Sequence, residues 1–140
     1  MLTDWPSKHH DNLISALRIS IGLIFLWFGL LKSFGYDPVY EIINASFPFL
    51  ATSAGNIILG IIEALIGLSL IINISPKIIY IILLFHLLGT LTVFLIAPSL
   101  MFQPHFPILT LAGEFVFKNI VLVIAALVIL SHHDINGRKQ

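Results

Sequence analysis

Six ionisable side chains lie inside otherwise apolar stretches of this sequence, and their chemistry needs an explanation. They are Arg18, Lys32, Glu63, His86, Glu114 and Lys118. An ionisable group near the centre of a bilayer costs at least about 2.5 to 3.5 kcal/mol on insertion scales, so such groups face the interior of a helix bundle and find partners there. Carboxylates, ammonium groups and an imidazole in an apolar setting can form ion pairs, hold a polar head group or pass a proton.

Depth estimates bring three of these residues into one layer. Counting about 1.5 Å of rise per residue from the face at which each span enters places Glu63, His86 and Lys118 in neighbouring layers near mid-membrane. We predict that Glu63 pairs with Lys118 across the second and fourth spans. Glu114 lies one helical turn before Lys118 and competes for it. Lys32 is expected close to the outer face.

The predicted polar layer has a structural and a functional interpretation. In the structural one, Glu63 and Lys118 neutralise each other and His86 makes one interhelical hydrogen bond, while Arg18 and Lys32 extend to the two head-group layers. In the functional one, the layer lines a polar cavity for a quinone-like head group, a proton path or a small solute. The sequence leaves both open.

Several other kinds of chemistry are not expected. The chain has no cysteine, so it lacks a thiolate nucleophile or metal ligand of its own. Seven Lys and Arg balance seven Asp and Glu, and no basic run is present, which disfavours nucleic acid as a partner. We predict no catalytic residue and no metal site, because only His86 lies clearly within a span. The remaining histidines are interpreted as solvated residues of the termini and one loop: His9, His10, His105, His132 and His133.

The elements that position these groups are predicted to be membrane-spanning helices. The composition is 58% hydrophobic and 10% charged, with a mean hydropathy of +1.02, far from the roughly 25% charged residues of soluble domains. Four stretches reach the about 20 apolar residues that a spanning helix needs; they are residues 13–34, 54–74, 77–97 and 112–131. We predict an all-α fold in which residues 1–140 form one four-span membrane bundle. The first stretch is too long for a cleaved signal peptide and is interpreted as a retained anchor.

Two spans carry polar and small residues at helical spacing. Arg18, Gly22, Phe25, Gly29 and Lys32 share one stripe of the first span, with spacings of 4, 3, 4 and 3. Small residues beside polar ones favour close helix packing in lipid. We therefore predict that this stripe is a helix interface.

The second span repeats this pattern, and the connections differ in length. Asn56, Gly60, Glu63 and Gly67 have the same spacing and predict a second interface. Residues 73–76 predict a tight turn that makes spans two and three an antiparallel hairpin. Residues 35–53 are expected to hold an interfacial segment, and residues 98–111 an ordered but irregular loop.

The basic residues favour one orientation. If the spans alternate, most of the Lys and Arg residues lie at the face that carries both termini: Lys8, Arg18, Lys77, Arg138 and Lys139. The positive-inside rule then places both termini in the cytoplasm.

Four segments of the chain resemble a known family. They are LRISIGLIFLWFGLLKSFGYDP in the first span, LGIIEALIGLSLI in the second, LGTLTVFLIAP in the third and FPILTLAGEFVFKNIVLVIAAL leading through the fourth. Together they resemble the YkgB-like family of reactive-chlorine-resistance membrane proteins (the RclC type), within the wider DoxX-like group. The resemblance covers about residues 17–130 and includes the order and spacing of Arg18, Lys32, Glu63 and Lys118.

This resemblance implies a small four-span protein of the bacterial inner membrane. The implied role is envelope tolerance of oxidative or reactive-chlorine stress, by a protein that is not an enzyme on its own. One alternative is a DoxX-like membrane subunit of a quinone-linked oxidoreductase, with a quinone as its cofactor and a redox protein as its partner. Another is a small-solute or proton transporter, formed as a homo-oligomer. The lipid bilayer is the expected partner in every case.

Overall fold

A computed structural model describes residues 9–74 and 77–137, and side chains up to residue 133. The described residues hold four helices that are long and apolar enough to cross a membrane, which confirms the predicted four-span all-α fold. They are α2 (His10–Ser33), α4 (Ser53–Ile71), α5 (Lys77–Leu91) continued by α6 (Val93–Ile96), and α8 (Leu111–Phe117) continued by α9 (Asn119–Gly137). The predicted turn at residues 75 and 76, and the basic residues Lys8, Arg138 and Lys139, lie outside the described residues.

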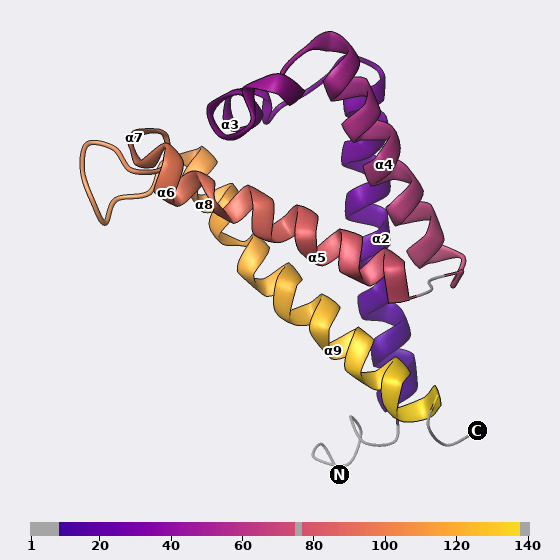
Figure 1. Ribbon diagram of the computed structural model, residues 1–140. Helices are drawn as coiled ribbons and strands as arrows, with labels where there is room; N and C mark the ends of the chain where they lie inside the picture. The colour runs from indigo at the N-terminus through magenta and orange to yellow at the C-terminus, as the bar shows by residue number, and fades with distance from the viewer. Residues whose placement is uncertain (1–8, 75–76, 138–140) are drawn as a thin grey trace.

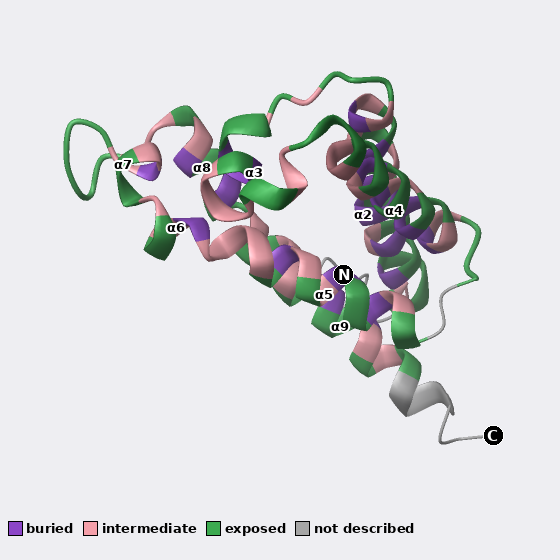
Figure 2. Ribbon diagram, turned by 45° about the horizontal axis from the view of Figure 1, so that its top comes forward, coloured by how far each residue is buried: buried purple, intermediate pink, exposed green. Residues whose placement is uncertain are grey.

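The surface of the spans fits lipid. Between 22% and 33% of each apolar stretch is buried inside the protein, so the outward surface of each helix is apolar as well. Figure 2 shows exposed residues along the outer sides of all four spans and buried residues on their inner sides. Backbone groups within a helix are already paired, so apolar side chains complete a surface that a hydrocarbon layer can solvate. The chain is therefore a multi-pass membrane protein.

The four spans are arranged as two pairs of helices. α2 packs along α4, and α5 packs along α9 (Figure 1). The pairs meet where α2 begins and α9 ends, and they diverge toward the other end of the bundle. α4 and α5 follow each other in the chain but pack chiefly against α2 and α9. The predicted hairpin of spans two and three is thus not a closely packed unit.

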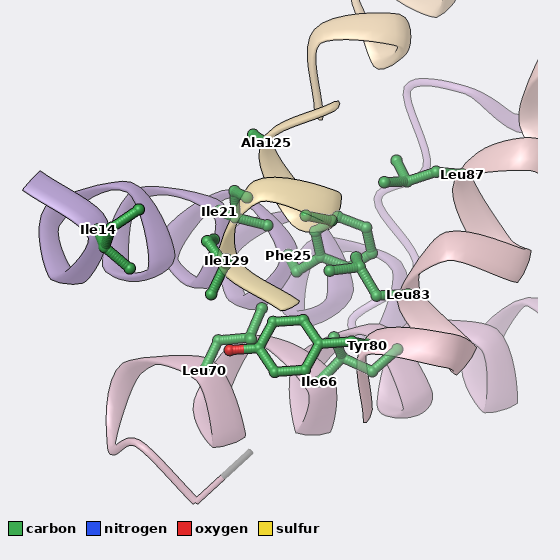
Figure 3. Packing of buried hydrophobic residues seen from close by; sticks show 11 residues of the cluster. Ile14, Ile21, Phe25, Ile66, Leu70, Tyr80, Leu83, Leu87, Ala125 and Ile129 are labelled. Atoms are coloured by element: carbon green, nitrogen blue, oxygen red, sulfur yellow. The ribbon is translucent and has the colours of Figure 1, made fainter. Parts of the chain in front are cut away.

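An apolar cluster joins the two pairs where they meet. Figure 3 shows side chains from all four spans converging there, with Tyr80 and Leu83 of α5 facing Ile66 and Leu70 of α4. Tyr80, Leu70 and Leu83 are almost fully buried. Burying apolar surface between helices holds the pairs together at this end. At the other end the described contact between α2 and α8 is smaller, with the rings of Phe28 and Phe115 edge to face and their centroids 5.6 Å apart.

The connections at the divergent end are folded. α3 (Tyr40–Ser46) is followed by η1 (Pro48–Leu50), and α3 packs against α5 and α6 with Ile42 and Ile43 buried. The predicted irregular loop contains the short helix α7 (Pro98–Met101) and a backbone bridge between Phe102 and Leu109. α3 consequently spans the gap between the helix pairs (Figure 1).

Candidate functional site

Glycines bring α2 and α4 close enough to bury charged side chains between them. A β-carbon at Gly29 would come within 2.5 Å of the Gly60 carbonyl oxygen, and one at Gly60 within 2.7 Å of that of Gly29. All five residues of the predicted α2 stripe are buried. On α4, Gly60, Glu63 and Gly67 are buried too. The predicted stripes are therefore confirmed as the α2–α4 interface.

Lys32 and Glu63 form an ion pair inside this interface. The Lys32 Nζ atom lies 2.6 Å from Glu63 Oε1 and 2.8 Å from Oε2, so one ammonium group contacts both carboxylate oxygens. Lys32 is 5% exposed and Glu63 3%. A buried charge is tolerated when it is paired and hydrogen-bonded, which both of these are.

The helix register explains why Lys32 reaches Glu63. The Lys32 side chain leaves its helix opposite Gly60, which stands one helical turn before Glu63. The three residues from Gly60 to Glu63 correspond to roughly 4.5 Å of axial rise at about 1.5 Å per residue, a distance that the flexible stem of a lysine covers. Lys32 therefore points along α4 into the bundle, and the prediction that it extends to the outer head-group layer is wrong.

His86 of α5 completes the cluster. Its Nε2 atom lies 3.0 Å from Glu63 Oε1, so the ring donates a hydrogen bond to the carboxylate across the gap between the helix pairs. The Phe25 ring of α2 packs against the His86 ring in an edge-to-face arrangement, with ring centroids 5.4 Å apart. With a neutral imidazole, the Lys32–Glu63–His86 cluster carries no net charge; with a protonated one it carries a single positive charge. The carboxylate and imidazole are in direct contact, as proton exchange requires.

The predicted pair of Glu63 and Lys118 is wrong. Within the described part of the chain Glu63 pairs with Lys32 and His86, whereas Lys118 is exposed and forms no ion pair. Lys118 stands at the junction of α8 and α9, where the fourth span breaks. Glu114, one turn earlier, is exposed as well. Depth alone could not identify the partner of Glu63, because α4 packs against α2 and lies apart from the fourth span.

Arg18 also has a different role from the predicted one. Instead of extending to the head groups, it is 8% exposed and its guanidinium donates to the carbonyl oxygens of Leu70 and Ile71 at the end of α4. The last carbonyl groups of a helix lack partners within the helix and carry partial negative charge. Arg18 thus fastens α2 to the C-terminal end of α4.

A groove of about 910 Å³ opens between the diverging helix pairs, and the cluster lies in its wall. Its surface is mostly apolar, and α3 lines one side with Ile42 and Ile43, followed by Phe47 directly after the helix. Six of the chain's phenylalanines line it: Phe25, Phe28, Phe47, Phe49, Phe85 and Phe115. Lys32, Glu63 and His86 contribute polar groups on one side of this groove.

The opposite side of the groove carries polar groups from the fourth span. Asn119 Nδ2 donates to Thr90 Oγ1 at 2.8 Å, which links α9 to α5. Lys118 lines the groove beside it. Asn119 was not identified from the sequence. An amide side chain among the apolar residues of a span, at the same depth as Thr90, indicates a hydrogen bond between helices. The groove therefore presents hydrogen-bonding groups on two walls and aromatic rings between them.

The remaining histidines gather at the end where α2 begins and α9 ends. The rings of His10 and His132 are 5.1 Å apart, and His132 Nε2 lies 3.4 Å from Asp11 Oδ1. Among the described residues no group of three or more potential metal ligands comes together. His105 lies exposed in the loop before Phe106.

Comparisons with protein-family models, with curated proteins and with solved structures found no match for this chain. Its function is therefore argued from the groove and the cluster.

Proposed function

We propose that this protein binds a quinone-class lipid in the groove between its two helix pairs. The observation that carries the proposal is a mostly apolar groove, lined by six phenylalanines, whose wall holds the buried Lys32–Glu63–His86 cluster. Aromatic side chains favour planar rings through stacked and edge-to-face contacts. Ligand sites of this kind combine an apolar lining with a few placed polar groups.

The cluster itself offers no free positive charge to a phosphate, and the exposed ammonium that lines the groove belongs to Lys118 of the fourth span. Lys32 is already matched by Glu63 at 2.6 Å, so its charge is not available to balance an anion. Carbonyl or hydroxyl oxygens of a quinone can accept from the amide of Asn119 and the ammonium of Lys118, and a quinol hydroxyl can donate to the second nitrogen of a neutral His86 ring. An isoprenoid tail would leave through the open side of the groove into lipid.

We place this activity in the bacterial inner membrane, in tolerance of oxidative or reactive-chlorine stress, because the span segments resemble the YkgB-like and DoxX-like proteins. A chain without cysteine that holds a quinone needs a redox partner to supply or remove electrons. The protein accordingly acts as a quinone-holding membrane subunit and is not an enzyme on its own.

The test is native purification in mild detergent followed by mass spectrometry of bound lipids. The wild type should retain quinone at a fixed ratio to protein. The double variant Lys32→Met, Glu63→Leu removes both charges together, so no charge is left unpaired in the interface. We expect it to lose bound quinone about tenfold or more, because Glu63 fixes the orientation of the His86 ring that contacts the head group, and a lost hydrogen bond of about 1.4 kcal/mol lowers affinity tenfold.

The matched control is Glu114→Gln, which changes an exposed carboxylate of the fourth span outside the cluster. It should retain as much quinone as the wild type. Equal quinone content in wild type and double variant, or none in either, contradicts the proposal; in that case a proton flux in liposomes that requires His86 would support transport instead.

A further inference from the structure

A second, polar pocket lies next to the cluster at the divergent end of the bundle. It encloses about 400 Å³ between the end of α2, the start of α3 and the start of α4. Polar and small residues dominate its lining, among them Asp37, Thr52, Ser53 and Asn56. Gly35 and Tyr40 complete its rim on the connection after α2. Apolar surface is the larger part of both cavities, but this pocket has a clearly higher polar share than the neighbouring groove.

Lys32 belongs to both cavities. It lines the polar pocket and the apolar groove, while its ammonium contacts Glu63 between them. The Lys32 side chain therefore lies between the pocket at the end of the bundle and the groove proposed to bind the lipid. From Lys32 the contacts continue through Glu63 to His86, each within 3.0 Å.

Two buried acceptor atoms in the polar pocket have no hydrogen-bond partner among the described residues. They are Asp37 Oδ2 and Asn56 Oδ1. Buried polar atoms are nearly always hydrogen-bonded, so these two acceptors mark polar positions beside the pocket that still need a donor. Asp37 Oδ1 accepts from the Val39 backbone N–H at 3.1 Å, so Oδ2 is the oxygen of this carboxylate that is left without a partner.

We infer that this pocket is the aqueous entrance of the cluster, through which water brings protons to Lys32, Glu63 and His86 from the side of the loop between α2 and α4. A protonated His86 ring passes its Nε2 proton to the Glu63 carboxylate, Glu63 releases it to water in the pocket, and the reverse sequence protonates the ring again. The inference rests on the pocket and the cluster, so it holds or fails independently of which lipid the groove binds.

Water access to the pocket can be tested directly, because the natural chain has no cysteine. Single variants Asn56→Cys and Ile62→Cys place a thiol on the same helix, one in the polar pocket and one in the groove. A charged methanethiosulfonate reagent should modify Asn56→Cys at least about tenfold faster in lipid vesicles, since thiolate forms only where water reaches it. Equal rates, or faster modification of Ile62→Cys, would overturn the inference.

Proton access is tested by hydrogen–deuterium exchange at the His86 ring, followed by nitrogen NMR in lipid nanodiscs. Asn56→Leu and, separately, Ser53→Leu fill the polar pocket and should slow exchange about tenfold or more. Gly89→Leu fills the groove side instead, because Gly89 faces it with only Phe47 nearby, and should leave exchange unchanged.

Both pocket variants, Asn56→Leu and Ser53→Leu, are measured, so that the result does not depend on one variant that fails to fold. Slower exchange in Gly89→Leu with normal exchange in both pocket variants would place the water entrance in the groove and exclude the pocket. Quinone content measured on the same samples separates this outcome from a failure of the lipid proposal.

Discussion

Lys32 and Glu63 stabilise each other inside the α2–α4 interface, and each would destabilise the fold if left alone. Glu63→Leu leaves the Lys32 ammonium without its counter-charge, and breaking a buried pair in this way costs about 3 to 5 kcal/mol. The double variant Lys32→Met, Glu63→Leu should recover most of that loss, because apolar residues of similar volume often replace a buried pair without penalty. Unfolding by denaturing detergent in mixed micelles measures both.

The control for this comparison is Glu114→Gln, which should change the free energy of unfolding by less than about 0.5 kcal/mol, as is usual for exposed substitutions. A double variant as unstable as the sum of the two single variants would show that the pair is not an independent electrostatic unit.

Arg18 gives a second prediction at this scale. Its guanidinium donates to two carbonyl groups at the end of α4, and charged hydrogen bonds contribute about 1.5 to 3 kcal/mol. Arg18→Leu should therefore lower the stability of the α2–α4 pair by this amount. Both bonds come from one guanidinium nitrogen, Nη1. Arg18→Lys should recover only part of the loss, because an ammonium group is more strongly hydrated than a guanidinium and costs more to bury. Full recovery by lysine would contradict the proposed geometry.

The sequence allowed the buried charged residues to be predicted, but not their partners. The stripes of Arg18, Lys32 and Glu63 follow from helical periodicity alone and are buried as expected. Which charge meets which depends on the pairing of helices and on their register. Depth along a span says nothing of lateral neighbours, so Lys118 seemed as good a partner for Glu63 as Lys32.

At the scale of elements, the close contact of α2 and α4 depends on glycines rather than on bulky apolar residues. A methyl group at Gly29 or at Gly67 would come within 2.5 Å of a carbonyl oxygen of the facing helix. Overpacking of this kind costs typically about 1 to 3 kcal/mol. We expect Gly29→Ala and Gly67→Ala each to destabilise the protein by at least that much and to lower the yield of folded protein in detergent.

Gly89→Ala is the matched control for these substitutions. A β-carbon there would meet only the Phe47 ring, at 3.9 Å, and alanine is a better helix former than glycine by about 1 kcal/mol. Its stability should equal or exceed that of the wild type. If Gly29→Ala were as stable as Gly89→Ala, the packing of α2 against α4 described above would be wrong.

Helix breaks were less predictable than helix positions. The regular hydrogen-bond pattern is interrupted for one residue at Thr92 in the third span, whose hydroxyl donates to the Gly89 carbonyl at 2.6 Å, and at Lys118 in the fourth, while both residues keep helical backbone angles. A hydropathy pattern contains no signal for either, because both breaks lie within continuous apolar sequence. The hydrogen bond from Asn119 to Thr90 joins the two spans next to these positions. The local helix geometry therefore depends on contacts between helices as well as on the sequence of each span.

For the whole molecule, the divergence of the two helix pairs creates the groove, and its volume should control ligand binding. Gly89→Phe places a ring in the groove beside Phe47, about one helical turn after His86 on α5. We expect bound quinone to fall about tenfold or more while the stability stays near that of the wild type, because the new ring occupies space that lipid would fill. Quinone content by mass spectrometry and unfolding in detergent are measured on the same sample.

A Gly89→Phe protein that unfolds easily would say nothing about binding, so Gly89→Ala accompanies it. Normal quinone content in a stable Gly89→Phe protein would contradict the placement of the ligand in the groove.

The orientation of the bundle is the remaining prediction for the whole molecule, and it follows from charge. α2 begins where α9 ends, with His10 and His132 in ring contact, and the loop before α8 lies at the other end. The positive-inside rule assigns the first of these ends to the cytoplasm. In intact cells an impermeant maleimide should therefore label His105→Cys and not Ser131→Cys, and lysis should expose both. The reverse pattern would invert the topology and place the polar pocket at Asn56 on the cytoplasmic side, so protons would reach the cluster from the cytoplasm instead of from outside the membrane.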